Sequence, residues 1–194
     1  MHTFMRKLAA LLCVVMLAAC AGVGIPLTND PDAKLALATT LVNDGRVMQA
    51  RGQTEEAIAI FEQRGDRAGL ARAYRVYALV AFSGGINADP IVLRKTPPHP
   101  RREELERAEE YLNRAAPLAV ETGQPYLVAR ITLLLGSSQY ERGNHREACT
   151  LYDRAIDQWR AAEAKQPGVV FQMAPGVRDF PDAVARIKAT VPCS

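Results

Sequence analysis

The chain has few of the side chains that usually carry catalytic or metal chemistry. It holds 3 histidines, 4 cysteines and 1 tryptophan in 194 residues. His2 belongs to the N-terminal segment, His99 lies in a proline run and His145 lies at a turn into an expected helix, so we expect no zinc site. Aromatic residues make up only 6% of the sequence. This scarcity, together with abundant Ala, Leu, Arg and Glu, favours helices over strands.

Common catalytic motifs are missing as well. Ser137 has no G-x-S-x-G elbow around it, and Gly84-Gly85 lacks the Lys-Ser/Thr that completes a phosphate-binding loop. Acidic pairs such as Glu109-Glu110 are adjacent on an expected helix, so their carboxylates point in different directions. We therefore expect a protein that is not an enzyme and that has no cofactor or metal.

One long hydrophobic run is present, and it lies at the N-terminus. Arg6 and Lys7 precede the apolar stretch LAALLCVVMLAA of residues 8–19, and small residues flank Cys20. A basic start, an apolar stretch and a small-residue processing site are typical of a secretory signal peptide. The alternative is an uncleaved membrane helix over residues 8–25, near the lower length limit of roughly 17 residues for a span. Glycines and a proline close to its end weaken that alternative.

Leu17-Ala18-Ala19-Cys20 resembles the bacterial lipobox, in which cleavage falls just before the cysteine. Similarity to bacterial lipoproteins implies that residues 1–19 are a signal peptide and that Cys20 carries the lipid. Residue 21 is not Asp, which in bacteria resembling the enteric group implies sorting to the outer membrane. Residues 20–30 would then be a lipid-anchored tether, and the folded part would face the periplasm.

The remaining chain, residues 31–194, is long enough for one domain with a hydrophobic core. The whole sequence has 24 Lys and Arg against 21 Asp and Glu. Two of the basic residues belong to the signal peptide, so this domain is close to neutral. Nucleic-acid-binding domains carry a basic stripe and a high pI, so we expect no nucleic acid partner.

The segment Ala129–Ile156 has small and aromatic residues at regular spacing. With Ala129 as position one, Gly136 falls at position eight, Ala148 at twenty and Ala155 at twenty-seven. This pattern resembles a tetratricopeptide (TPR) repeat, a helix–turn–helix unit of 34 residues. Small residues at these positions let paired helices pack closely.

The same template fits two earlier segments. Ala38 starts one copy, with Gly45 at position eight and Gly52 at fifteen. Ala71 starts another, whose second helix follows only after the insertion of residues 84–100. The resemblance implies an all-α, TPR-like solenoid of about three repeats, the usual minimum for a stable array.

The ends of the array are predicted from helix signals. Asp30 is an expected N-cap and Pro31 an expected first helical residue, so the first helix should run over Pro31–Ala50. Residues 167–194 should form a C-terminal capping segment with a helix at Asp182–Thr190.

In TPR proteins the first helices of the repeats line a concave groove. Carried over to this sequence, the groove positions give a basic and partly apolar trough, which suits an acidic or C-terminal carboxylate peptide. The groove residues singled out are Arg46, Arg72, Arg75, Phe82, Arg130 and Tyr140.

Two cysteines remain after the lipid anchor, Cys149 and Cys193. An exported protein permits a disulfide between them, and the alternative is a buried thiol at 149 and a free thiol in the tail.

Two classes of function follow from these features. The first is a lipoprotein scaffold or adaptor that binds envelope proteins, in assembly, in secretion or pilus biogenesis, or in recruitment of cell-wall hydrolases. The second is a protein that binds a small molecule or a peptidoglycan fragment, with residues 84–100 as a lid over a pocket. A homodimeric array is a further alternative.

Overall fold

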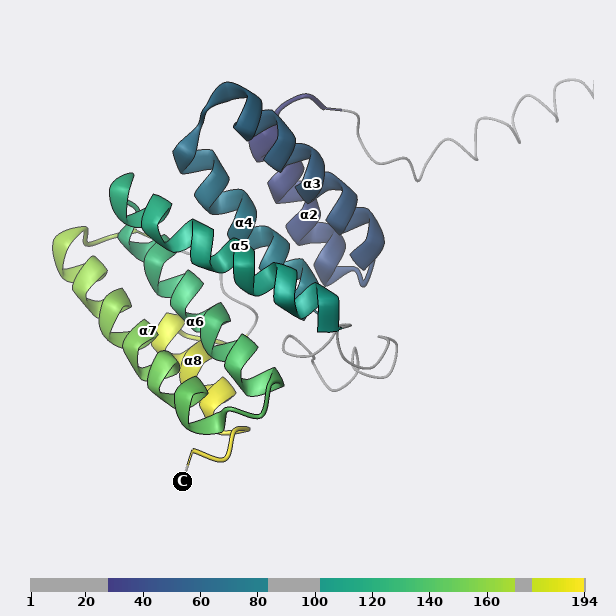
Figure 1. The fold of residues 1–194 in the computed structure, drawn as a ribbon. Helices are drawn as coiled ribbons and strands as arrows, with labels where there is room; N and C mark the ends of the chain where they lie inside the picture. Colours follow the sequence, from purple (N-terminus) through teal and green to yellow (C-terminus); the bar gives the residue numbers. More distant parts are fainter. Residues whose placement is uncertain (1–27, 84–101, 170–175, 194) are drawn as a thin grey trace, which may run out of the picture.

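The computed structural model describes residues 28–83, 102–169 and 176–193 (Figure 1). The expected signal peptide, Cys20, most of the tether and the insertion of residues 84–100 lie outside the described residues. Over the described ranges, no helix has the length and apolar character needed to cross a membrane.

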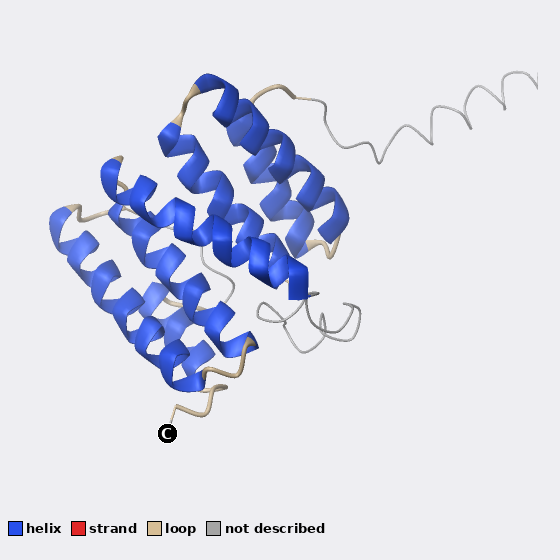
Figure 2. Ribbon diagram, in the orientation of Figure 1, coloured by secondary structure: helices blue, strands red, loops and turns tan. Residues whose placement is uncertain are grey.

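Seven helices and no strand are found in the described residues, which confirms the prediction of an all-α fold (Figure 2). Consecutive helices pack as pairs, α2 with α3, α4 with α5 and α6 with α7, and α8 packs on α7 (Figure 1). The helices are α2 (Pro31–Asn43), α3 (Val47–Arg64), α4 (Arg67–Phe82), α5 (Arg102–Glu121), α6 (Pro125–Glu141), α7 (His145–Lys165) and α8 (Phe180–Lys188).

Aspartate side chains mark the start of three helices. The Asp30 carboxylate accepts a hydrogen bond from the backbone N–H of Asp32 at 3.1 Å, and the Asp66 carboxylate accepts one from Gly69 at 2.8 Å. Asp179 accepts from the N–H of Asp182 at the start of α8. Each bond satisfies a backbone donor that the first helical turn leaves without a partner.

The first helix is shorter than predicted. It ends at Asn43 rather than Ala50, because Gly45 adopts a left-handed conformation, with φ of 72°, in the turn before α3. Gly45 therefore occupies the turn position of the repeat, position fifteen, and not position eight. Gly52 lies inside α3. The predicted register of the first repeat was wrong by seven residues.

In the corrected register the three repeats agree at their tightest helix contacts. Counting from Pro31, positions eight, twenty and twenty-seven carry alanines that are fully buried, and the equivalent positions of the other repeats also carry small residues. Only small side chains allow two helix backbones to approach at such crossings. These residues are Ala38, Ala50 and Ala57, then Ala78, Ala108 and Ala115, and finally Gly136, Ala148 and Ala155.

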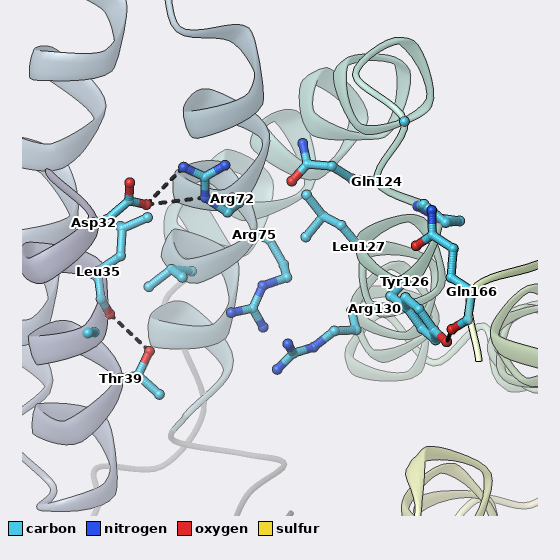
Figure 3. A pocket seen from close by; sticks show the side chains of 14 residues that line it. Asp32, Leu35, Thr39, Arg72, Arg75, Gln124, Tyr126, Leu127, Arg130 and Gln166 are labelled. Carbon is cyan, nitrogen blue, oxygen red and sulfur yellow. Dashed lines mark hydrogen bonds and ion pairs between the residues drawn. The ribbon is translucent and has the colours of Figure 1, made fainter. Parts of the chain in front are cut away.

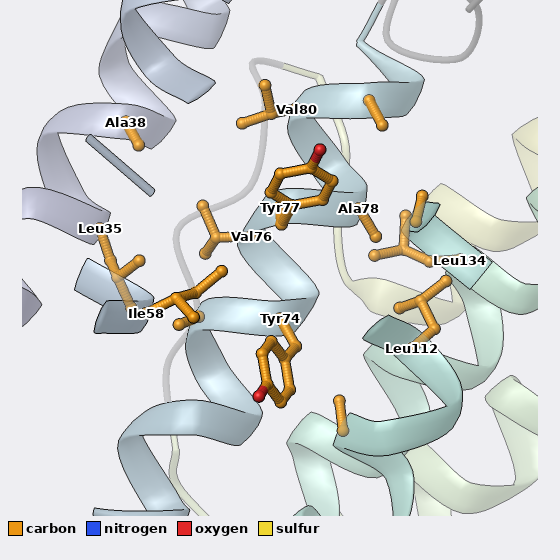
Figure 4. Packing of buried hydrophobic residues seen from close by; sticks show 14 of the residues in the cluster. Leu35, Ala38, Ile58, Tyr74, Val76, Tyr77, Ala78, Val80, Leu112 and Leu134 are labelled. Carbon is orange, nitrogen blue, oxygen red and sulfur yellow. The ribbon is translucent and has the colours of Figure 1, made fainter. Parts of the chain in front are cut away.

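Helix α4 is the centre of the larger hydrophobic cluster. It packs against α2, α3, α5 and α6, and ten of its 16 residues are buried. Figure 4 shows Tyr74 on the side of α4 that faces α5, where Leu112 of α5 also lies, and Val76 on the side that faces α2 and α3. Because the middle repeat is enclosed on both sides, it positions the first helices of the neighbouring repeats.

The C-terminal helix α8 begins two residues earlier than predicted, at Phe180, and ends at Lys188 rather than Thr190. Phe180 starts the helix because its ring is buried against Trp159 of α7. Val184 is fully buried in the same cluster. Cys149 of α7 and Cys193 form a disulfide with a Cα–Cα distance of 5.7 Å. The chain end is therefore fastened to α7 both by packing and by a covalent bond.

Candidate functional site

The first helices of the three repeats, α2, α4 and α6, line a pocket of about 440 Å³ (Figure 3). Its walls combine aliphatic side chains with three arginines. The residues around it include Asp32, Leu35, Ala36, Thr39, Arg72, Arg75, Val76, Tyr126, Leu127, Arg130 and Gln166.

The charge of Arg72 is balanced within the protein. Its Nε and Nη2 atoms donate to the same carboxylate oxygen of Asp32, at 3.2 and 2.8 Å. Its guanidinium also lies over the ring of Phe61, 5.6 Å from the ring centroid. Arg72 therefore joins α4 to α2 at the edge of the pocket, and its charge has an acidic partner within the protein.

Arg75 and Arg130 come from neighbouring first helices and point into the same space (Figure 3). Both side chains are half-buried. Burial away from water, reinforced by the positive charge of Arg130, lowers the pKa of Arg75 to about 9. Burial also lowers the pKa of Arg130. Arg75 stays charged at neutral pH, and it has no ion pair with any residue that the structure describes.

Other polar groups around the pocket are held by the protein itself. The Thr39 hydroxyl donates to the Leu35 carbonyl at 3.0 Å, one turn earlier in α2. The Tyr126 hydroxyl donates to the Gln166 carbonyl at 2.7 Å and so joins the start of α6 to the end of α7. Leu127 and Val76 supply apolar surface beside the two arginines.

Three of the predicted groove residues, Arg72, Arg75 and Arg130, meet in this pocket. The other three lie elsewhere. Arg46 is the N-cap residue of α3, in the turn after α2, because the first repeat starts seven residues earlier than predicted. Phe82 is a core residue, 2% exposed, at the end of the enclosed helix α4. Tyr140 lines a different hollow beside the turn between α6 and α7.

Sequence reasoning missed Asp32, the partner of Arg72. In the corrected register Asp32, Leu35 and Thr39 occupy positions two, five and nine of the first repeat. Arg72 and Arg75 occupy positions two and five of the second repeat. The signal was present, because Asp30 and Pro31 already marked the helix start. Counting the repeat from that start would have placed Asp32 opposite the arginines.

This arrangement is suited to binding an anion. A guanidinium donates two parallel hydrogen bonds to a carboxylate or phosphate, and two guanidiniums that face one space can hold one acidic group between them. Among the described residues, no group of three or more His, Cys, Asp or Glu side chains is arranged to hold a metal ion.

Comparison with protein families gives a match to the tetratricopeptide repeat over residues 133–161. This segment comprises most of α6 and α7, so the third repeat of the fold is a TPR repeat. No curated protein matches the chain. A TPR repeat implies protein partners in general.

Proposed function

We propose that the protein is a non-enzymatic adaptor of the bacterial cell envelope, held at the outer membrane by lipid on Cys20 and facing the periplasm. It binds a protein partner through the pocket between α2, α4 and α6. The partner contributes an acidic side chain or a C-terminal carboxylate. The TPR repeat supports a protein partner, and the lipobox-like sequence before Cys20 supports the anchor.

The observation that carries this proposal is the pair formed by Arg75 and Arg130. A half-buried charge without a counterion lowers the stability of a folded protein, so its retention needs a reason. Arg75 has no acidic partner among the described residues, and the neighbouring Arg130 adds a like charge. A carboxylate bound beside Arg75 would supply the counterion that Arg75 lacks among these residues, at a site that aliphatic side chains partly shield from water.

The direct test is crosslinking in intact envelopes. A photo-reactive amino acid at Thr39, on the pocket wall, should trap one defined protein. The double substitution Arg75→Glu with Arg130→Glu should abolish that adduct, because two carboxylates would then repel the acidic group. The matched control is Arg154→Glu, which changes an exposed arginine on α7 and should leave the adduct unchanged. An adduct that persists in the double variant would refute the pocket as the binding site.

The membrane anchor needs its own experiment, because it rests on residues outside the described ones. The intact mass of the protein from native membranes reports cleavage before Cys20 and the number of acyl chains. A mass that includes residues 1–19 would contradict the anchor. It would leave the binding pocket untouched.

The pocket volume also supports a second candidate, a small anionic ligand such as a peptidoglycan fragment. A volume of about 440 Å³ lies within the range of small-molecule sites. Thermal stabilisation of the purified protein separates the two candidates. Peptidoglycan fragments should raise the melting temperature if the ligand is small, and acidic envelope peptides should do so if it is a protein.

A further inference from the structure

A second hollow adjoins the arginine pocket. It has a volume of about 240 Å³ and lies between the end of α5, the start of α6 and the end of α7. Its surface is mainly apolar, and we call it the Val120 groove. Its lining includes Val120, Val128, Ala161, Ala162 and Lys165.

One turn of the chain forms a wall that the two hollows share at one edge of the array. Gly123, Gln124 and Pro125, the turn between α5 and α6, line both of them. On the opposite side, Lys165 lines the Val120 groove and the next residue, Gln166, lines the arginine pocket. The hydrogen bond from the Tyr126 hydroxyl to the Gln166 carbonyl fixes the distance between the two sides. An extended chain lying across this edge would therefore meet both surfaces.

The chemistry of the two hollows is complementary. The arginine pocket offers two guanidiniums, and the Val120 groove offers exposed aliphatic surface with the ammonium of Lys165 beside it. Val120 is 67% exposed, which is high for an aliphatic side chain in the last turn of a packed helix. Basic side chains in both hollows, together with the aliphatic surface of the Val120 groove, match an acidic segment that also carries an aliphatic residue.

We propose that the partner binds as one extended acidic segment that occupies both hollows. One of its carboxylates lies between Arg75 and Arg130, and one of its aliphatic side chains packs on Val120. This inference rests on the proposed function, since it assigns the partner's acidic group to the same arginine pocket. It adds a specificity site that selects among acidic sequences.

A phage-displayed library of random twelve-residue peptides, selected on the full-length protein in detergent, tests this proposal. We expect the enriched sequences to share an acidic residue and an aliphatic residue at one fixed spacing. Selection on Val120→Gln should lose the aliphatic preference and keep the acidic one. For the best peptide, Val120→Gln should weaken binding about tenfold, the effect of losing one buried aliphatic contact.

Two variants serve as controls. Met48→Gln changes another exposed aliphatic side chain, 70% exposed on α3, and should change neither preference. Arg75→Glu with Arg130→Glu should lose the acidic preference. Thermal melts of each variant establish that it is folded.

The outcomes separate the two proposals. Enrichment of acidic sequences without an aliphatic residue, or an aliphatic preference that survives in Val120→Gln, would overturn the Val120 groove and leave the proposed function standing. Enriched sequences without an acidic residue would overturn both, as would no enrichment at all.

Discussion

The ring of Trp159 lies flat on the ring of Phe180, with 4.2 Å between their centroids and 13° between their planes. Trp159 also makes an edge-to-face contact with the ring of Tyr126 in α6, with 4.8 Å between the ring centroids. These two ring contacts join α8 to α7, and α7 to the helix that forms one wall of the arginine pocket. Trp159 is also the only tryptophan in the sequence, so the tryptophan fluorescence of the protein reports on the surroundings of this ring.

Substitution of Phe180→Ala should release α8 from α7. Removing a buried phenylalanine ring costs about 3–5 kcal/mol, much of which falls on this short helix. We expect a red shift of Trp159 emission while the far-ultraviolet circular dichroism stays close to that of the wild type. The exposed alanine Ala185, on the outer side of α8, offers the control Ala185→Ser, which should leave the emission unchanged.

Removal of the Cys149–Cys193 disulfide should loosen the same helix. Reduction, or Cys193→Ser, is expected to lower the free energy of unfolding by about 2–4 kcal/mol. Hydrogen exchange should accelerate in α8 and remain slow in the enclosed helix α4. The exposed Lys188–Asp153 ion pair also joins α8 to α7, and Lys188→Ala should cost less than about 1 kcal/mol. Unchanged exchange in α8 after reduction would contradict this role of the disulfide.

Two glycines inside helices should respond to alanine in opposite ways. A Cβ at Gly136 would lie 2.7 Å from the ring of Tyr152, so Gly136→Ala forces α6 and α7 apart and should cost about 1–3 kcal/mol. A Cβ at Gly52 meets no atom within 4 Å, so Gly52→Ala should stabilise α3 by up to about 1 kcal/mol. Chemical denaturation of the two variants measures both changes. Destabilisation by Gly52→Ala would contradict the corrected register.

The charge of Arg75 should lower stability at neutral pH when no ligand is bound. The folded pKa of about 9 lies below the usual value of 12.5, so the unfolded chain binds more protons between these two pH values. The cost is fully present below pH 9 and shrinks as pH rises above it. Arg75→Met should therefore raise the melting temperature at neutral pH. The expected gain in the free energy of unfolding is on the order of 1 kcal/mol, and this gain should decrease above pH 9.

The control for that experiment is Arg154→Met, which removes an exposed charge and should change the melting temperature little at any pH. A gain of equal size in both variants would show that net charge, and not the burial of Arg75, is responsible.

The sequence was sufficient to predict paired helices and the registers of the second and third repeats. It was ambiguous in the first repeat. The template has small residues at positions eight and fifteen, which are seven apart, and again at positions twenty and twenty-seven, which are also seven apart. Gly45 and Gly52 have the same spacing, so a shift of seven residues still fits. The conformation of Gly45, with its positive φ, resolves the ambiguity.

The same reasoning explains which site residues were predictable. The correct registers of the second and third repeats placed Arg72, Arg75 and Arg130 in the groove. The wrong register of the first repeat placed Arg46 there. Phe82 has the position of a groove residue but is buried, because α4 has neighbours on both sides. Burial of this kind depends on the stacking of repeats and is not contained in the pattern of a single helix.

The turns within repeats and the turns between repeats lie at opposite edges of the array, because each helix runs back along the one before it. The arginine pocket and the Val120 groove meet at Gln124, in a turn between repeats. Ser83 and Arg102, the described ends of the connection within the second repeat, lie at the other edge. That connection is therefore expected to tolerate a change in length without loss of recognition at Gln124. For the same reason it is a natural place to insert an epitope or a fluorescent label into a working copy of the protein.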